Sequence, residues 1–267
     1  MSRWQDKVVL VTGGSAGLGR ALAKTFGRHS ARVVIAARRE GPLNETVESI
    51  ESRGGACQGI LADVTCDEDV QRLIRTVIEE YGRLDVLVNA AGRSARGAIA
   101  ETTVNDFQEL LDLNFLATVR CTRAALPHLQ KTSGHVVNIG SLASKVGVRY
   151  LGAYPASKFA VAAYSQQLRL ELATQGVHVL LVCPGPIARS DGGGRYQPKA
   201  DGLPDKAAKP GGGARVRALD ADWLAKRIVT ACERRDRELV VPGKARLLFA
   251  LSQLSPRLGD WLLKKWT

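Results

Sequence analysis

The sequence has few aromatic residues, which make up 5% of the chain, and a single Met. Proteins that bind single-stranded nucleic acid stack bases on aromatic side chains placed among cations, so this composition argues against that class. No apolar run reaches the roughly 18 residues that a membrane-spanning helix requires. The first seven residues contain no apolar stretch of the signal-peptide kind, so we expect no secretory signal.

Cysteine is also scarce. The chain has five cysteines, an odd number at scattered positions: Cys57, Cys66, Cys121, Cys183 and Cys232. They form neither a disulfide framework nor a pair with metal-ligand spacing, so we expect no metal site and a reducing, cytoplasmic location.

Acidic residues are outnumbered, with 26 Asp and Glu against 38 Lys and Arg, a formal net charge of +12 and a pI near 9.8. Such a balance attracts nucleic acid, anionic lipid or acidic carrier proteins. The cations are spread along the whole chain, and aromatics are not interleaved with them. We therefore expect no nucleic-acid partner.

Short β-branched runs alternate with helical patterns along most of the chain. Apolar runs predict strands over 8–11, 32–36, 57–61, 86–88, 135–139, 177–182 and 238–241. Helical patterns lie between them, over 20–28, 42–53, 67–81, 104–126, 155–174 and 222–233. Near-continuously apolar strands are buried on both faces. The pattern predicts one α/β domain over residues 1–267, a Rossmann-type doubly wound parallel sheet of seven strands with helices on both faces.

Residues 190–214 interrupt this alternation, since they are rich in Gly and Pro and have almost no apolar periodicity. They follow the sixth predicted strand, at the edge where a doubly wound sheet places its ligands. We predict a mobile substrate loop here, with a merely disordered insertion as the alternative.

A Gly-rich turn, Thr12 to Gly19, stands between the first strand and the first helix. Glycine lets the backbone approach a ligand closely, and the helix N-terminus presents free N–H groups to a pyrophosphate. No Gly-Lys-Ser/Thr follows, so the turn is not a P-loop. The second strand ends at Ala37-Arg38-Arg39, without the carboxylate that would contact a ribose 2′-hydroxyl. Two guanidinium groups there favour a 2′-phosphate, and hence NADP(H).

Tyr154 and Lys158 stand four residues apart and share one face of a predicted helix that begins near Pro155. A phenol, whose ordinary pKa is about 10, is a poor base at neutral pH. A cation beside it favours the phenolate, so the pair becomes a usable general acid or base. Asn89 and Ser141 follow strand ends, as Gly13 does, so chemistry and cofactor converge at one edge of the sheet.

Together these segments resemble the short-chain dehydrogenase/reductase family, in its order and spacing, over roughly residues 7–241. The resemblance rests on Thr12-Gly13, Gly17, Gly19, Asn89-Ala90-Ala91-Gly92, Asn114, Ser141, Tyr154, Lys158 and Pro184-Gly185. It implies a carbonyl–alcohol oxidoreductase. Tyr154 would pass the proton, Ser141 would bind the carbonyl oxygen, Lys158 would hold the nicotinamide ribose and favour the phenolate, and Asn114 would anchor a water.

The resemblance also implies a set of cofactor-binding residues and an oligomeric state. Arg38 matches the basic position of NADP-preferring members, and Asp63 matches the adenine contact. The full set is Gly13, Ser15, Gly17, Leu18, Gly19, Arg38, Arg39, Asp63, Val64, Asn89, Gly92, Tyr154, Lys158, Pro184, Gly185 and Ile187. Members are usually homodimers or homotetramers through two long central helices.

Two positions depart from the family pattern. Ala90 replaces the second Asn of Asn-Asn-Ala-Gly, and Arg189 stands where many members have a Thr that helps to bind the carboxamide. The substrate stays open between a simple ketone or aldehyde and a 3-oxoacyl thioester. An NADP-binding sensor or scaffold without catalysis is the alternative from another class.

The segment 244–267 is an amphipathic extension with basic residues around an apolar stripe. Leucines and tryptophans recur in it at helical spacing, at Leu247, Leu248, Leu251, Leu254, Leu258, Trp261, Leu262 and Trp266. Two interpretations stand: the stripe packs on the body or on a second subunit, or the extension touches an anionic membrane peripherally.

Overall fold

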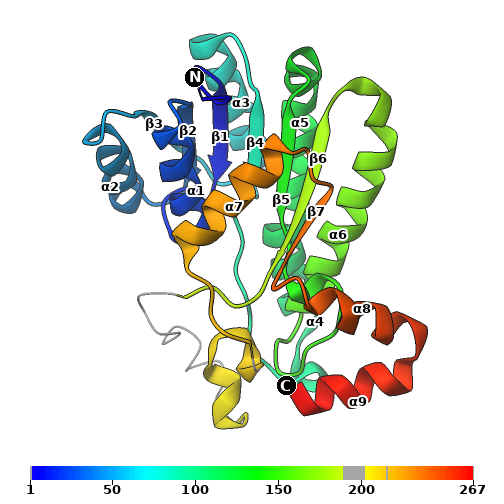
Figure 1. The fold of residues 1–267 in the computed structure, drawn as a ribbon. Coiled ribbons are helices and arrows are strands. Elements are labelled where there is room, and N and C mark those ends of the chain that lie inside the picture. The colour runs from blue at the N-terminus through cyan, green and yellow to red at the C-terminus, as the bar shows by residue number, and fades with distance from the viewer. Residues whose placement is uncertain (1, 189–201, 215, 267) are drawn as a thin grey trace.

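The computed structural model describes residues 2–188, 202–214 and 216–266. Seven strands form one parallel sheet in the order β3-β2-β1-β4-β5-β6-β7 (Figure 1). The strands are β1 (Val8–Thr12), β2 (Arg32–Ala37), β3 (Ala56–Leu61), β4 (Val86–Asn89), β5 (His135–Ile139), β6 (His178–Pro184) and β7 (Glu238–Val241). The predicted fold class is confirmed, and the predicted and observed strand ends agree within two residues.

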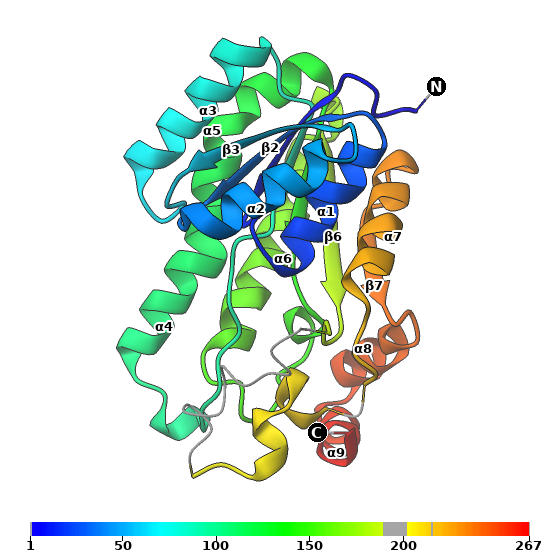
Figure 2. The same ribbon diagram turned by 90° about the vertical axis from the view of Figure 1, so that its left-hand side faces the viewer.

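Helices cover both faces of the sheet (Figures 1 and 2). One layer consists of α1 (Gly17–Arg28), α2 (Glu40–Glu51) and α7 (Ala221–Glu233), and the other of α3 (Asp67–Tyr81), α5 (Ala117–Thr132) and α6 (Tyr154–Glu171). Each layer has its own core, because successive side chains of a strand point to opposite faces. In β1, Val9 and Val11 pack with the first layer, whereas Val8 and Leu10 pack with the second.

The single helix predicted over 104–126 is in fact three consecutive pieces. The α-helix α4 (Val104–Leu111) passes into a π-helical turn, η2 (Asp112–Leu116), and then into α5, which continues to Thr132. The structure thus places a change of helical type where the sequence predicts an uninterrupted helix.

The predicted loop over 190–214 is described only from residue 202 onward. That part contains two short 3₁₀ turns, η6 (Asp205–Ala208) and η7 (Pro210–Gly213). The first part of the predicted loop, together with Arg189, lies outside the described residues.

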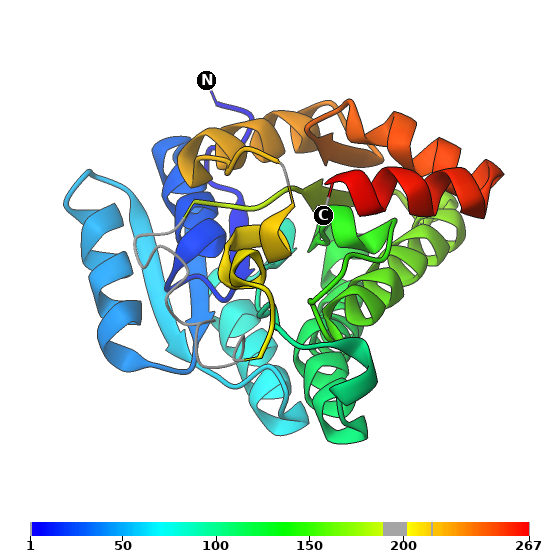
Figure 3. The same cartoon turned by 90° about the horizontal axis from the view of Figure 1, so that it is seen from below.

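Two helices, α8 (Ala245–Leu254) and α9 (Pro256–Trp266), follow β7. They lie beside each other below the carboxyl ends of the strands, next to the η6–η7 segment (Figure 3). None of the described helices has both the length and the apolar character needed to cross a bilayer.

Candidate active site

The sheet changes its winding direction between β1 and β4, which are neighbours in it. Ligands of doubly wound sheets bind at such a point, beyond the carboxyl ends of the strands. The connections that follow β1, β2, β3, β4, β5 and β6 all leave this edge, because the strands are parallel. They carry most of the residues that the sequence predicts as functional.

The turn after β1 needs glycine for steric reasons. A Cβ on Gly13 would lie 2.8 Å from the Cα of Ala91, and a Cβ on Gly19 would lie 2.3 Å from the carbonyl oxygen of Gly13. Gly13 also has a φ of 67°, which disfavours other residues. The turn is therefore packed tightly between the loop after β4 and the first turn of α1.

The N-terminus of α1 is suited to an anion. Ala16 precedes the helix without a side-chain cap, and no acidic residue lies in its first turn. The first amide groups of a helix have no intrahelical partner and carry partial positive charge. Gly17 has a φ of 52°, and nothing lies within 4 Å of the position its Cβ would take. The site can therefore accept a pyrophosphate, while Ser15 and Leu18 are buried beside it.

Arg38, just beyond β2, forms an ion pair with Asp63, just beyond β3. Its Nη1 lies 3.5 Å from Asp63 Oδ2. Burial alone would raise the pKa of Asp63, but hydrogen bonds from Thr65 and the charge of Arg38 outweigh it, and the pKa lies below its usual value. Arg39 is exposed and Val64 is buried. The structure thus places a paired guanidinium and carboxylate at the end predicted to hold the adenosine.

Lys158 is a buried cation in the second turn of α6. Its Nζ donates a hydrogen bond of 2.8 Å to the carbonyl oxygen of Ile139, at the end of β5. The same Nζ lies 5.9 Å from the centroid of the Tyr154 ring. Burial lowers the pKa of Lys158 to about 8. The predicted pair is therefore brought together.

Asn114 ties the loop after β4 to α6. Its Oδ1 accepts from the Arg93 N–H at 2.9 Å, and its Nδ2 donates to the Arg93 carbonyl oxygen and to Ser157 Oγ, both at 2.9 Å. A Cβ on Gly92 would lie 2.8 Å from Asn114 Oδ1 and 3.7 Å from Lys158 Nζ. Asn114 belongs to the π-helical turn η2, a feature frequent at functional sites.

Ser141 begins the 3₁₀ turn η3 (Leu142–Ser144) directly after β5. Its Oγ accepts a hydrogen bond from the Ala143 N–H at 3.1 Å, and its own N–H donates to Ser144 Oγ at 3.0 Å. The hydroxyl of Ser141 thus has a fixed position on the loop that leads to Tyr154.

Ser157 donates a hydrogen bond to the Tyr154 carbonyl oxygen at 2.8 Å, which helps to hold the first turn of α6.

The remaining predicted cofactor residues have structural contacts of their own. Asn89 is buried, and its Nδ2 donates to Thr122 Oγ1 and Asn138 Oδ1, which links β4 to α5 and β5. Pro184 ends β6, and the Gly185 N–H donates to the Val241 carbonyl oxygen at 2.7 Å. Ile187 forms an isolated parallel bridge with Leu219. The Asn89 Nδ2 is therefore engaged within the protein, whereas its buried Oδ1 has no hydrogen-bond partner among the described residues.

Three residues outside the predicted site set also shape this edge, and only Thr12 among them belongs to a predicted motif. Thr12 Oγ1 accepts from the N–H groups of Ala90 and Ala91, and Ser157 connects Asn114 to α6. Ser157 lies three residues after Tyr154, and this helical spacing alone would have placed the two residues on one face of the helix. Arg96 binds the η6–η7 segment, and no local pattern indicated that contact.

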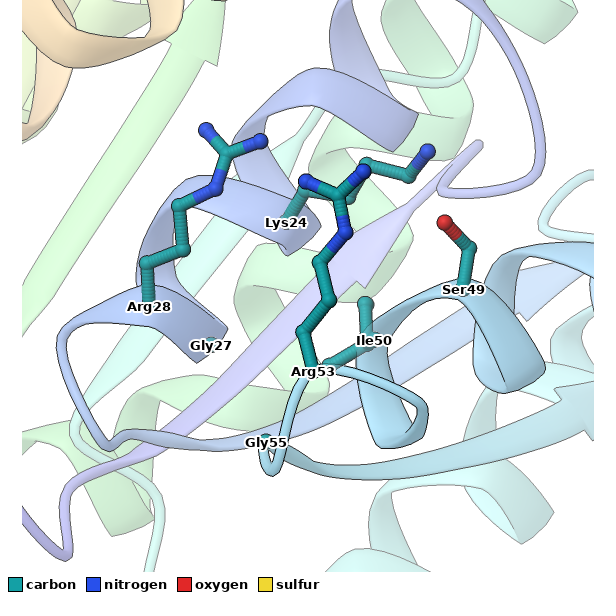
Figure 4. Close-up of a pocket in the computed structure, with 7 residues that line it drawn as sticks. All are labelled: Lys24, Gly27, Arg28, Ser49, Ile50, Arg53 and Gly55. Atoms are coloured by element: carbon teal, nitrogen blue, oxygen red, sulfur yellow. The ribbon is translucent and has the colours of Figure 1, made fainter.

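A basic pocket elsewhere on the molecule is not part of this site. Lys24, Arg28 and Arg53 line it, together with Ser49 (Figure 4). It lies at the C-terminal ends of α1 and α2, and so at the opposite edge of the sheet from the Gly-rich turn. Burial and the neighbouring guanidinium groups lower the pKa of Lys24.

The family model described as "short chain dehydrogenase" matches residues 7–199. The uncharacterized oxidoreductase YxnA of Bacillus subtilis is 32% identical over 99% of this chain and 73% of its own length. A putative ketoacyl reductase of Streptomyces coelicolor is 36% identical over 71% of this chain and 76% of its own length.

Two solved structures give the same fold. An actinorhodin polyketide ketoreductase with NADPH has a TM-score of 0.79 and 29% identity, covering 90% of this chain and 97% of its own. A short-chain dehydrogenase/reductase of Burkholderia phymatum in complex with NAD has a TM-score of 0.83 over 97% of this chain and 96% of its own. At 24% identity it shows the fold alone.

Proposed function

Because this chain belongs to the short-chain dehydrogenase family, we propose that it transfers a hydride between NADP(H) and a carbonyl or secondary alcohol. The observation that carries the proposal is the position of the Lys158 ammonium group. It is buried, bonded to Ile139 and held 5.9 Å from the Tyr154 ring centroid. A cation so placed favours the phenolate form of the tyrosine.

The nicotinamide, when bound, supplies or accepts the hydride. Tyr154 gives its phenolic proton to the carbonyl oxygen in reduction and removes it in oxidation. Ser141 donates a hydrogen bond to that oxygen from the start of η3. Lys158 stabilises the resulting phenolate and binds the nicotinamide ribose. Asn114 supports the proton relay through a water and holds the loop after β4 in place.

We further propose that the cofactor is NADP(H) rather than NAD(H). Arg38 is largely exposed and lies directly beyond β2, where its guanidinium can bind a 2′-phosphate. No carboxylate belongs to the Ala37-Arg38-Arg39 stretch itself. The ion pair with Asp63 orients Arg38 before the cofactor binds.

The experiment that tests the reaction is NADPH oxidation across ketones, aldehydes and acyl thioesters, with Tyr154→Phe as the variant. We expect Tyr154→Phe to lower kcat/KM by about 10²- to 10⁴-fold, the usual contribution of a general acid. NADPH affinity should stay within a few-fold, since the ring is retained. Tyr150→Phe, a nearby tyrosine change, is the control and should keep its activity.

Unchanged turnover in Tyr154→Phe would refute this assignment. If NADPH binds but no substrate of the panel turns over, the silent-sensor interpretation gains support.

The cofactor proposal is tested with Arg38→Asp. Loss of a charge-assisted bond of about 1.5–3 kcal/mol corresponds to a roughly 10- to 100-fold rise in the KM for NADPH. The KM for NADH should change far less. Arg28→Asp, in the basic pocket at the opposite edge, makes the same change of net charge and should leave both constants unchanged. An equal rise for both cofactors would contradict a 2′-phosphate contact.

A 3-oxoacyl thioester is the second candidate substrate. Similarity to a putative ketoacyl reductase and to a polyketide ketoreductase favours it, as does the net charge of +12, which suits an acidic carrier protein. Comparison of acetoacetyl thioesters with simple ketones of equal length separates the two classes by kcat/KM.

We also propose a cytoplasmic homodimer or homotetramer. Large apolar side chains are exposed on α4, η2 and α6, at Val104, Leu116 and Leu170. The five cysteines are free, which suits a reducing compartment. Sedimentation analysis of the native protein tests the oligomeric state.

A further inference from the structure

The α8–α9 hairpin is attached to the rest of the protein through one face of each helix. Phe249 of α8 is 9% exposed and packs, with Leu263 of α9, in a cluster that includes Val146. The two helices also approach each other closely, because a Cβ on Gly259 would lie 2.8 Å from Ser252 Oγ. These contacts leave the outer face of the hairpin without a partner among the described residues.

The outer face carries four large apolar side chains. Their exposed fractions are 67% for Leu247, 83% for Leu254, 39% for Leu258 and 58% for Trp261. At about 100° per residue, these side chains stand roughly 140° or more around their helices from Phe249 and Leu263. They form a stripe on each helix that points away from the core.

Cations surround this stripe. Residues 244–267 contain five basic residues, Lys244, Arg246, Arg257, Lys264 and Lys265, against the single acid Asp260. The Nζ of Lys265 lies 5.4 Å from the Trp261 ring centroid. Helices that lie in the plane of an anionic bilayer surface combine exposed Leu and Trp side chains with neighbouring Lys and Arg. A symmetric contact with a second copy would instead bring the same five cations together.

We propose that the α8–α9 hairpin docks the protein on anionic membrane surfaces, with Leu247, Leu254, Leu258 and Trp261 inserted among the acyl chains. The lipid that binds is an anionic glycerophospholipid of the bilayer itself. The docked stripe is apolar, and the flanking cations contact the headgroups.

The hairpin adjoins the loop that connects Ser141 to Tyr154. Arg149 in this loop donates to the carbonyl oxygen of Lys264 at 3.4 Å. Gly212 of η7 packs against the same loop, since its Cβ would lie 3.1 Å from the Arg149 carbonyl oxygen. A cavity of about 190 Å³ separates the hairpin from residues 145–147 and Phe159. A docked molecule therefore has its candidate active site next to the bilayer.

From this position we infer the substrate class: an apolar carbonyl or alcohol that resides in the membrane. This second part rests on the proposed function, whereas membrane docking does not. A long-chain ketone dispersed in vesicles and a short water-soluble ketone provide the two test substrates.

The docking test is co-sedimentation of the full chain with vesicles of phosphatidylcholine, with and without 30% phosphatidylserine. We expect binding to the anionic vesicles that weakens as salt is raised. Leu254→Ser with Trp261→Ser should lower the partition coefficient at least tenfold, and so should Lys264→Glu with Lys265→Glu.

The chain offers matched controls on α7. Trp223 is exposed and has Arg227 over its ring at 5.2 Å, as Trp261 has Lys265. Trp223→Ser, and Lys226→Glu with Arg227→Glu, should bind vesicles like the parent protein. Circular dichroism melts check that every variant folds.

Two results would overturn the docking proposal. One is full-length protein that stays in the supernatant with anionic vesicles at low salt. The other is a dimer in solution that Leu254→Ser with Trp261→Ser dissociates, which would make the hairpin a subunit interface.

The substrate part has separate outcomes. The hairpin variant should lose at least tenfold in kcat/KM on the vesicle-borne ketone but keep its activity on the soluble one. Equal activity on both substrates would refute a membrane-resident substrate. If the proposed function is wrong, neither ketone will be turned over, although the protein will still bind the vesicles.

Discussion

Lys158 is the residue whose protonation state decides what Tyr154 can do. The ammonium group is buried, which disfavours its charge and lowers its pKa to about 8. A single hydrogen bond to the Ile139 carbonyl oxygen helps to retain the proton. The site therefore keeps its cation at neutral pH but loses it within the range accessible to an enzyme assay.

We predict that kcat/KM for carbonyl reduction falls above pH 8, approaching tenfold per pH unit. The pH profile of kcat/KM reports groups of the free enzyme, and deprotonation of Lys158 removes the charge that stabilises the phenolate. Lys158→Arg should remove the contribution of residue 158 to this limb and leave only the loss of the phenolic proton that reduction requires, since a guanidinium stays protonated. Lys226→Arg is the control on the surface. A limb at an unchanged pH in Lys158→Arg would show that Lys158 does not set it.

For single residues, the sequence predicts which side chains lie close together but not which hydrogen bonds hold them in place. Tyr154 and Lys158 share a helix face because 3.6 residues make one turn. The bonds from Asn114 to Arg93 and Ser157 depend on how three separate segments pack. No spacing along the chain encodes that packing.

Among the elements, the predicted helix over 104–126 shows that apolar periodicity predicts a helix but not a change of helical type within it. Its apolar positions recur as a helix requires, and the structure does place helix throughout this range. The π-helical turn at Asp112–Leu116 adds one residue to a turn, and its buried residue is the polar Asn114. The predicted strands 135–139 and 238–241 coincide with β5 and β7, in which the apolar pair at 136–137 and the apolar triplet at 239–241 are buried.

The η6–η7 segment is held by a side chain that precedes it by more than a hundred residues. Arg96 is buried, and its Nε and Nη2 donate to the carbonyl oxygens of Ala207 and Lys209 at 2.6 and 2.9 Å. Its Nη1 donates to Ser94 Oγ and the Ala95 carbonyl oxygen. One guanidinium thus joins the loop after β4 to the segment after β6.

We predict that Arg96→Lys loosens this segment, because an ammonium group lacks the planar fork that bridges two carbonyls. Amide hydrogen exchange of peptides covering 202–214 should be at least tenfold faster, and the substrate KM should rise more than kcat falls. Arg93→Lys, whose side chain forms a surface ion pair with Glu109, should exchange like the parent. Unchanged protection in Arg96→Lys would show that other contacts hold the segment.

Across the whole molecule, the two edges of the sheet have different tasks. The carboxyl edge carries the candidate active site, whereas the opposite edge contains a buried histidine pair that joins β5 to β6. His178 Nε2 donates to the Asp236 carbonyl oxygen at 2.8 Å, so its Nδ1 is an acceptor. His135 Nδ1 lies 2.9 Å away and must donate to it. This arrangement fits two neutral rings, the form that burial favours by lowering both pKa values, and Trp4 packs edge-on against His135.

This pair should make the fold sensitive to mild acid. Burial, together with the neighbouring His178, lowers the pKa of His135 to about 3, and burial also lowers the pKa of His178. Below pH 6.5 the unfolded chain takes up a proton on His135, while the folded state, in which the pKa of this ring is about 3, does not. The lowered pKa of His178 acts in the same direction. The free energy of unfolding must then decrease as the pH falls, by up to about 1.4 kcal/mol per pH unit from His135. The window runs from pH 6.5 down to 5, before carboxylates contribute.

Denaturant unfolding at several pH values in this window measures the slope. Replacing both rings, in His135→Leu with His178→Leu, should flatten it even if the variant is less stable overall, because no buried imidazole remains to exclude a proton. Trp223→Ser, an exposed change that leaves both rings in place, should keep the parent slope. If the double variant also keeps that slope, the acid sensitivity arises elsewhere, and the pair stabilises the sheet only through its hydrogen bonds.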